Sequence, residues 1–175
     1  MNETDAPTGS LNASATHESG HAFQRWGLGY EIAFAQISEK HADCFVRSRQ
    51  DALQCDQKEL ANFKYDIDRL ICACSGYAAE LITGVCDESE WLSSKDRQRG
   101  FEAAKRLSRG DTQAAELLMA WGRRMAFLIL SAHQAKVQRL ADALLTHRRL
   151  SREEISDLLG SNGHNGSRSG DPLCG

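Results

Sequence analysis

Proline is scarce in this 175-residue chain, which has two prolines, Pro7 and Pro172, both near the ends. Because proline ends or kinks helices, a proline-free interior favours long uninterrupted helices. The chain also lacks any run of roughly 20 apolar residues, the length that a helix needs to cross a bilayer. We therefore expect a globular domain without a membrane span.

The chain also has no large excess of positive or negative charge. The formal net charge is -3 and lysines and arginines are scattered among acids, so we expect neither a nucleic-acid nor an anionic-membrane partner.

No G-x-x-x-x-G-K-[ST] phosphate loop occurs, so these residues alone are not expected to use ATP. The first ten residues have no apolar run typical of a secretory signal, and six cysteines fit a reducing compartment. We expect a cytoplasmic location.

Hydrophobic periodicity predicts a mainly α fold, a helical domain with one small β-hairpin. Residues 1–12 are expected to form a disordered tail, 13–160 the domain, and 161–175 a flexible tail rich in Gly, Ser and Asn. Helices are predicted over residues 14–26, 57–83, 94–108, 111–145 with a break near Gly122, and 151–159. Gly84 is expected to end the second of these.

A hairpin is predicted where β-formers replace the helical pattern. Residues 30–37 and 44–47 form two short runs on either side of a polar turn. Strict alternation places Ile32, Phe34 and Gln36 on one face of the first strand.

One motif points to chemistry: His17-Glu18-Ser19-Gly20-His21 matches H-E-x-x-H. Residues four apart on a helix share a face, about 6 Å apart along the axis, so both imidazoles can bind one zinc ion. Glu18 lies beside the first ligand without being one, and we expect it to take a proton from the water that attacks a peptide carbonyl.

The alternative is a pair of histidines on a solvated helix face. The small Ser19 and Gly20 between them and the apolar Ala22 and Phe23 after them weigh against it. Glycine lowers helix stability by about 1 kcal/mol relative to alanine, so Gly20 indicates close packing against that turn. A catalytic zinc needs a third protein ligand. Spacing alone leaves this choice open among His41, His133, His147, Cys86 and several acids.

In its motifs the chain resembles the peptidase domain of the FtsH family of ATP-dependent zinc metalloproteases. Residues 17–22 read His-Glu-Ser-Gly-His-Ala where the family has His-Glu-Ala-Gly-His-Ala. Residues 75–80 read Ser-Gly-Tyr-Ala-Ala-Glu against Gly-Gly-Arg-Ala-Ala-Glu, and 92–96 read Leu-Ser-Ser-Lys-Asp where the family places its zinc-binding Asp. The resemblance runs from about residue 14 to 159.

The resemblance implies that Asp96 is the third zinc ligand, a role that carboxylate chemistry permits. The alternative for Asp96 is an ordinary acid at a helix N-terminus. Glu80 is expected either to orient a ligand, to bind a helix end, or to be a structural helix residue. The family's edge strand beside the active site corresponds to the hairpin, which could pair with an extended peptide. The family's ATPase module, membrane helices and Pro-Arg-Gly segment have no counterpart here.

Together these features predict a zinc metalloendopeptidase that acts on peptides or unfolded proteins. The alternatives are a regulatory protease specific for one protein partner and an inactive binding module of the same fold. The sequence leaves a homo-oligomer and an unfoldase acting in trans open as partners.

Overall fold

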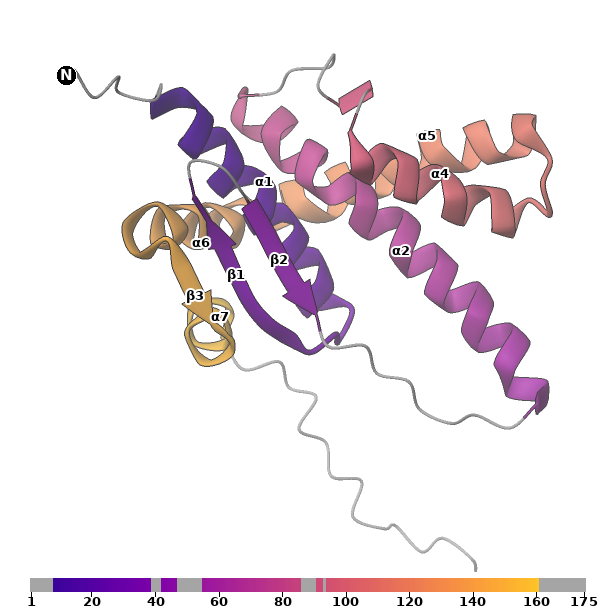
Figure 1. Cartoon of the computed structure of the whole chain (residues 1–175), viewed down its shortest axis with the longest axis horizontal. Helices are drawn as coiled ribbons and strands as arrows, with labels where there is room; N and C mark the ends of the chain where they lie inside the picture. Colours follow the sequence, from indigo (N-terminus) through magenta and orange to yellow (C-terminus); the bar gives the residue numbers. More distant parts are fainter. Residues whose placement is uncertain (1–7, 39–41, 47–54, 86–90, 93, 161–175) are drawn as a thin grey trace, which may run out of the picture.

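The computed structural model of the chain describes residues 8–38, 42–46, 55–85, 91–92 and 94–160. The predicted disordered tail before residue 8 and the flexible tail 161–175 lie outside these residues. Helices dominate the fold, and the prediction of a mainly α domain with a small hairpin is confirmed (Figure 1). No helix among the described residues is both long and apolar enough to span a membrane.

The first helix, α1 (Thr8–Gly27), is the central element of the fold. It packs against α2 (Cys55–Thr83), α6 (Gln134–His147) and the hairpin, as Figure 1 shows. Nearly every residue from Ala15 to Gln24 is buried, polar ones included. Helix α1 begins six residues before the predicted start at Ser14, so it includes residues 8–12, which were assigned to the tail.

Three helices follow the sequence signals closely. Helix α2 ends at Thr83, and Gly84 takes the left-handed conformation with φ of 75°. Ser94 caps α4 (Lys95–Leu107) by accepting a hydrogen bond from the Arg97 backbone N–H. A capping box formed by Ser151 and Glu154 opens α7 (Arg152–Leu159). These ends are local in sequence, which is why they could be predicted.

The predicted break near Gly122 is wrong. Helix α5 (Thr112–Ala132) runs through Gly122, and the chain breaks at His133, before α6. A Cβ at Gly122 would lie 2.9 Å from Leu70 Cγ. This glycine therefore lets α5 approach α2 closely, rather than ending a helix.

The hairpin consists of β1 (Ile32–Ile37) and β2 (Ala42–Val46), paired antiparallel, with β3 (Arg149–Ser151) on the other side of β1. A register shift between Ile32 and Phe34 changes the alternation. Ile32 is consequently buried together with Ala35 and Ile37, whereas Phe34 and Gln36 are partly exposed, so the prediction that Ile32 shares a face with Phe34 and Gln36 is wrong. The sequence did not reveal β3, because three residues are too few for a period.

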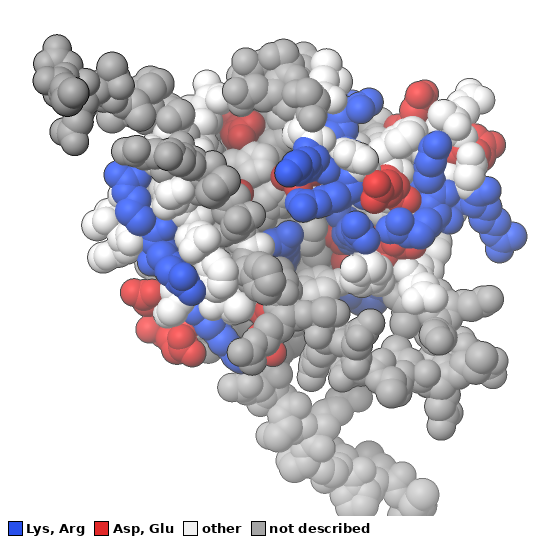
Figure 2. All heavy atoms as spheres, in the orientation of Figure 1, with Lys and Arg blue, Asp and Glu red and all other residues white. Residues whose placement is uncertain are grey.

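The hydrophobic core lies between α1, the helices around it and the inner face of the sheet. Its largest fully buried side chains come from four of the helices and from β3: Leu70, Leu130, Leu140, Leu144, Leu150, Ile155 and Leu159. On the face drawn in Figure 2, acidic and basic side chains are intermingled over the α4 and α5 side, consistent with the small net charge.

Candidate metal centre

Two histidines converge from successive turns of α1. The rings of His17 and His21 lie with centroids 4.7 Å apart and planes inclined by 72°. Their Nε2 atoms are 3.0 Å apart. His21 is buried and His17 is partly exposed. The helical spacing therefore brings together the two atoms that the motif predicts to bind a metal.

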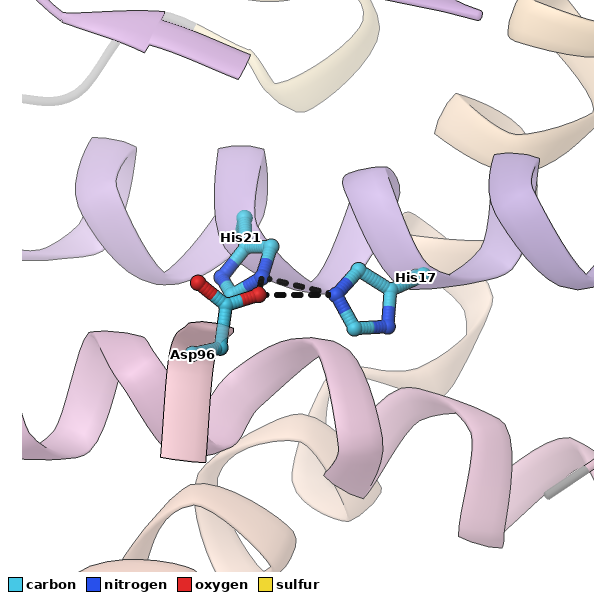
Figure 3. Close-up of side chains that lie close together, drawn as sticks. All are labelled: His17, His21 and Asp96. Atoms are coloured by element: carbon cyan, nitrogen blue, oxygen red, sulfur yellow. Dashed lines mark hydrogen bonds and ion pairs between the residues drawn. The ribbon is translucent and has the colours of Figure 1, made fainter. Parts of the chain in front are cut away.

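Asp96 reaches the same point from the first turn of α4 (Figure 3). Its Oδ2 lies 3.2 Å from His17 Nε2 and 3.1 Å from His21 Nε2. Arg99 Nη1 donates to the other oxygen, Oδ1, at 3.0 Å and so holds the carboxylate in place. Within the described residues, His17, His21 and Asp96 form the one group of three side chains that could hold a metal ion.

Helix α2 fixes the orientation of both rings from behind. His17 Nδ1 is 2.7 Å from Glu80 Oε1. His21 Nδ1 is 2.8 Å from the main-chain oxygen of Cys72 and 3.2 Å from Ser75 Oγ. Ser75 Oγ donates its own proton to the same Cys72 oxygen at 2.6 Å. Such partners on the second ring nitrogen are typical of metal-binding histidines.

These partners determine where the ring protons lie. A carbonyl and a carboxylate only accept, so both Nδ1 atoms carry protons, and each neutral ring then has its lone pair on Nε2. Two such lone pairs and Asp96 Oδ2 meet at separations of 3.0 to 3.2 Å, an arrangement that requires a cation or an extra proton between them. Ligand atoms of a tetrahedral zinc ion, at about 2.0–2.1 Å from it, lie about 3.3 Å apart. The residues therefore fit zinc.

The pKa values of the site follow from the same contacts. Burial would raise the pKa of Asp96, but hydrogen bonds from His17 and His21 outweigh burial and lower that pKa well below its usual range. Burial would lower the pKa of His17, but hydrogen bonds to Asp96 and Glu80 raise it to about 10. This concentration of acidic groups around an imidazole favours any cation at Nε2.

Two glycines make room for the site. A Cβ at Gly20 would lie 2.4 Å from the main-chain oxygen of Ser75, which explains the glycine that the sequence already marked as a close contact. A Cβ at Gly76 would lie 2.4 Å from His17 Nε2. Helix α2 thus packs closely against the α1 backbone at Gly20, and its own Gly76 packs closely against the His17 ring. A side chain at either glycine would clash with its neighbour.

Glu18 lies on α1 between the two histidines and is 7% exposed. Within the part of the chain that the structure describes, its carboxylate accepts no hydrogen bond. Burial raises its pKa above the ordinary value, and the charges of His21 and His17 act in the opposite direction. A carboxylate with these properties is suited to accept a proton from a nearby water molecule.

The structure brings together His17, His21 and Asp96, and Glu18 lies near enough for the charges of these three residues to act on its pKa. Of the other candidates for third ligand, His133 packs against Phe23 with ring centroids 5.2 Å apart, and His147 ends α6. His41 and Cys86 lie outside the described residues.

Sequence reasoning missed several supporting groups. They are the Cys72 main-chain oxygen, Ser75, Gly76 and Arg99. Three of these lie on α2, more than 50 residues from the histidines that they contact. The one available signal was the pair Ser75-Gly76, small residues in a long helix, which indicates a close neighbour without identifying it.

Comparison of the chain with protein-family models and with curated proteins finds no match. The resemblance to the FtsH family therefore rests on the motifs alone. The class of site is given by the geometry: two imidazoles and one carboxylate converging on a single point, with a buried glutamate beside them.

Proposed function

We propose that this chain is a zinc-dependent endopeptidase. His17, His21 and Asp96 would hold the metal and Glu18 would act as general base. The observation that carries the proposal is the convergence of His17 Nε2, His21 Nε2 and Asp96 Oδ2 within 3.2 Å of one another, while both Nδ1 atoms lie within hydrogen-bond distance of other groups. A site of three protein ligands is typical of catalytic rather than structural zinc, since it leaves one position for water or substrate.

A bound zinc ion would supply a Lewis acid that polarises the peptide carbonyl and lowers the pKa of water. Glu18 performs the proton transfers in this proposal. Its carboxylate accepts the proton of the attacking water and then donates it to the leaving amine nitrogen. A raised pKa suits both steps, because a group that accepts and returns a proton works best near the operating pH.

Glu80, Cys72 and Ser75 support this chemistry without touching the substrate. They fix the ring planes of His17 and His21, so that both Nε2 atoms point to one place before any metal arrives. The peptide class of the substrate is inferred from the H-E-x-x-H motif and from the FtsH resemblance. These residues contain no ATP-binding phosphate loop that could drive the unfolding of a folded substrate. An unfolded protein is therefore the suitable test substrate.

The test combines metal analysis with cleavage of casein, an unfolded protein. We expect about one zinc per chain, with the zinc content reduced in His17→Ala. Cleavage should fall at least 100-fold in Glu18→Gln, which removes the base but keeps the ligands. The control is Glu153→Gln, which removes the same charge from the exposed first turn of α7.

Two results would overturn the proposal. Casein cleavage that persists in Glu18→Gln would come from another site or from a contaminant. Iron in place of zinc would indicate a different reaction class, because two histidines and a carboxylate also form the iron site of many oxygenases.

A further inference from the structure

Helix α5 carries apolar side chains on two opposite faces. The buried face packs into the fold and consists of Ala115, Met119, Gly122, Ala126 and Leu130. The outer face carries three large apolar side chains that solvent reaches, with exposures of 68% for Leu117, 41% for Trp121 and 46% for Leu128. A helix at a protein surface normally has polar residues on its outer face, so this face of α5 is suited to a further contact.

The neighbouring helix α4, which packs beside α5 (Figure 1), does not share this feature. All exposed residues of α4 are polar or charged: Lys95, Arg97, Gln98, Arg99, Glu102, Lys105 and Arg106. Helix α4 is thus an ordinary surface helix with one apolar face. The apolar outer face therefore belongs to α5 and is not a general property of this side of the fold.

The exposed apolar residues of α5 follow a regular spacing. Leu117, Trp121 and Leu128 lie along one line of the helix together with Arg124, which is also exposed. Successive members of this line are four, three and four positions apart. This is the heptad spacing with which two helices pack side by side in a coiled coil. The natural partner for the line is therefore another helix with the same spacing.

The spacing reads the same in both directions, so α5 complements itself in an antiparallel pair. A two-fold axis at the height of the Gly122–Arg123 peptide sets position 117 opposite 128 of the second copy, and 121 opposite 124. Leucine then faces leucine at both ends of the contact. In the middle, the guanidinium of Arg124 faces the Trp121 ring of the second copy, a favourable cation–π pair.

We propose that α5 pairs with α5 of a second copy of this chain, antiparallel, through Leu117, Trp121, Arg124 and Leu128. One helix from each copy forms a small contact, below the roughly 800 Å² per partner of a standard interface. We therefore expect a weak, reversible dimer with a dissociation constant on the order of 10 μM. The proposal concerns a surface of α5 alone and does not depend on the peptidase function.

A terminal segment of the same chain is a poorer occupant of this face. Residues 161–175 form the longest segment outside the described residues, and they contain one large apolar residue, Leu173. A single leucine cannot cover three large apolar side chains. A different protein would need its own helix with an aromatic or acidic residue opposite Arg124, whereas a second copy already supplies Trp121 there.

The first experiment measures the mass of the full chain by sedimentation velocity, at concentrations from well below to well above about 10 μM. We expect the mass to rise from that of the 19.3 kDa chain to twice that value. Leu117→Lys and Leu128→Glu should each weaken the association at least about 10-fold, because each places an unpaired charge in the contact. The matched control is Phe63→Lys, at a 53% exposed position of α2, which should dimerise like the unaltered chain.

The second experiment tests the register. In an equimolar mixture of the Leu117→Lys and Leu128→Glu chains, the lysine of one copy lies opposite the glutamate of the other. We expect this mixture to dimerise at least about 10-fold more tightly than either variant alone. Zinc content should be the same in all these chains, since no metal ligand is changed.

Four results would overturn the proposal. A chain that stays monomeric at every concentration would leave the outer face to a different protein, and growth beyond a dimer would exclude a closed two-fold contact. Association that survives Leu117→Lys and Leu128→Glu would use another surface. A mixture that associates no better than its components would refute the antiparallel register.

Discussion

Replacing Gly76 with alanine should damage the metal centre while leaving the fold intact. The added Cβ would lie 2.4 Å from His17 Nε2 and 2.5 Å from Cε1. For an ordinary contact of 3.4 Å, the ring must retreat by about 1 Å. A zinc–nitrogen bond of about 2.0–2.1 Å does not survive that displacement. His17 would also lose its 2.7 Å contact with Glu80.

The expected loss of zinc affinity is about 100-fold or more, because removal of a supporting partner alone typically weakens a metal site 10- to 100-fold. Stability of the metal-free protein should hardly change. The displaced group is a side chain that can rotate, and alanine in a helix gains up to about 1 kcal/mol over glycine. Competition with a chromophoric zinc chelator measures the affinity, and urea unfolding with chelator present measures the stability.

Gly122→Ala is the matched control. It introduces the same Cβ into a buried helix, 2.9 Å from Leu70 Cγ, and contacts no metal ligand. We expect lower stability from overpacking, by about 1–3 kcal/mol, with zinc affinity unchanged. If Gly76→Ala bound zinc as tightly as the unaltered chain, His17 would not be a ligand in the proposed orientation and the reasoning would be refuted.

Three other predictions follow from the same contacts. Glu80→Ala should weaken zinc binding by 10- to 100-fold, read by the same chelator competition, and unchanged affinity would exclude Glu80 as the partner of His17. Gly20→Ala should lower the free energy of unfolding in urea by at least about 1–3 kcal/mol, since its Cβ meets the Ser75 main-chain oxygen, and an unchanged midpoint would contradict this contact. Burial raises the pKa of Cys72 and of Cys74 to about 12, so iodoacetamide at pH 8 should leave both unlabelled by mass spectrometry until the protein unfolds.

Features local in sequence could be predicted. The spacing of His17 and His21 and the helix starts at residues 94 and 151 each depend on a few adjacent residues. Gly20 was correctly associated with close packing, although its neighbour, Ser75, could not be named. Asp96 was selected through resemblance, because helix spacing on α1 says nothing about a residue 75 positions away.

Features that depend on how α1 meets α2 could not be predicted. His21 contacts the Cys72 main-chain oxygen and Ser75 Oγ, which lie more than 50 residues away in the sequence. The first of these is a backbone atom that every residue possesses, so no residue type signals it. Gly122 illustrates the same limit. Glycine was expected to break the helix, but α5 continues through Gly122, which packs closely against Leu70. The short strand β3 pairs with β1, more than 100 residues away in the sequence, and three residues carry no local pattern that predicts this.

The central claim is that one zinc ion is bound by two imidazoles and a carboxylate. X-ray absorption at the zinc edge tests it most directly, because it reports the elements and distances around the metal in solution. The account predicts a first shell of nitrogen and oxygen alone, at about 2.0–2.2 Å, with imidazole scattering from two rings. A sulfur shell at about 2.3 Å, or protein that binds no zinc at all, would contradict it.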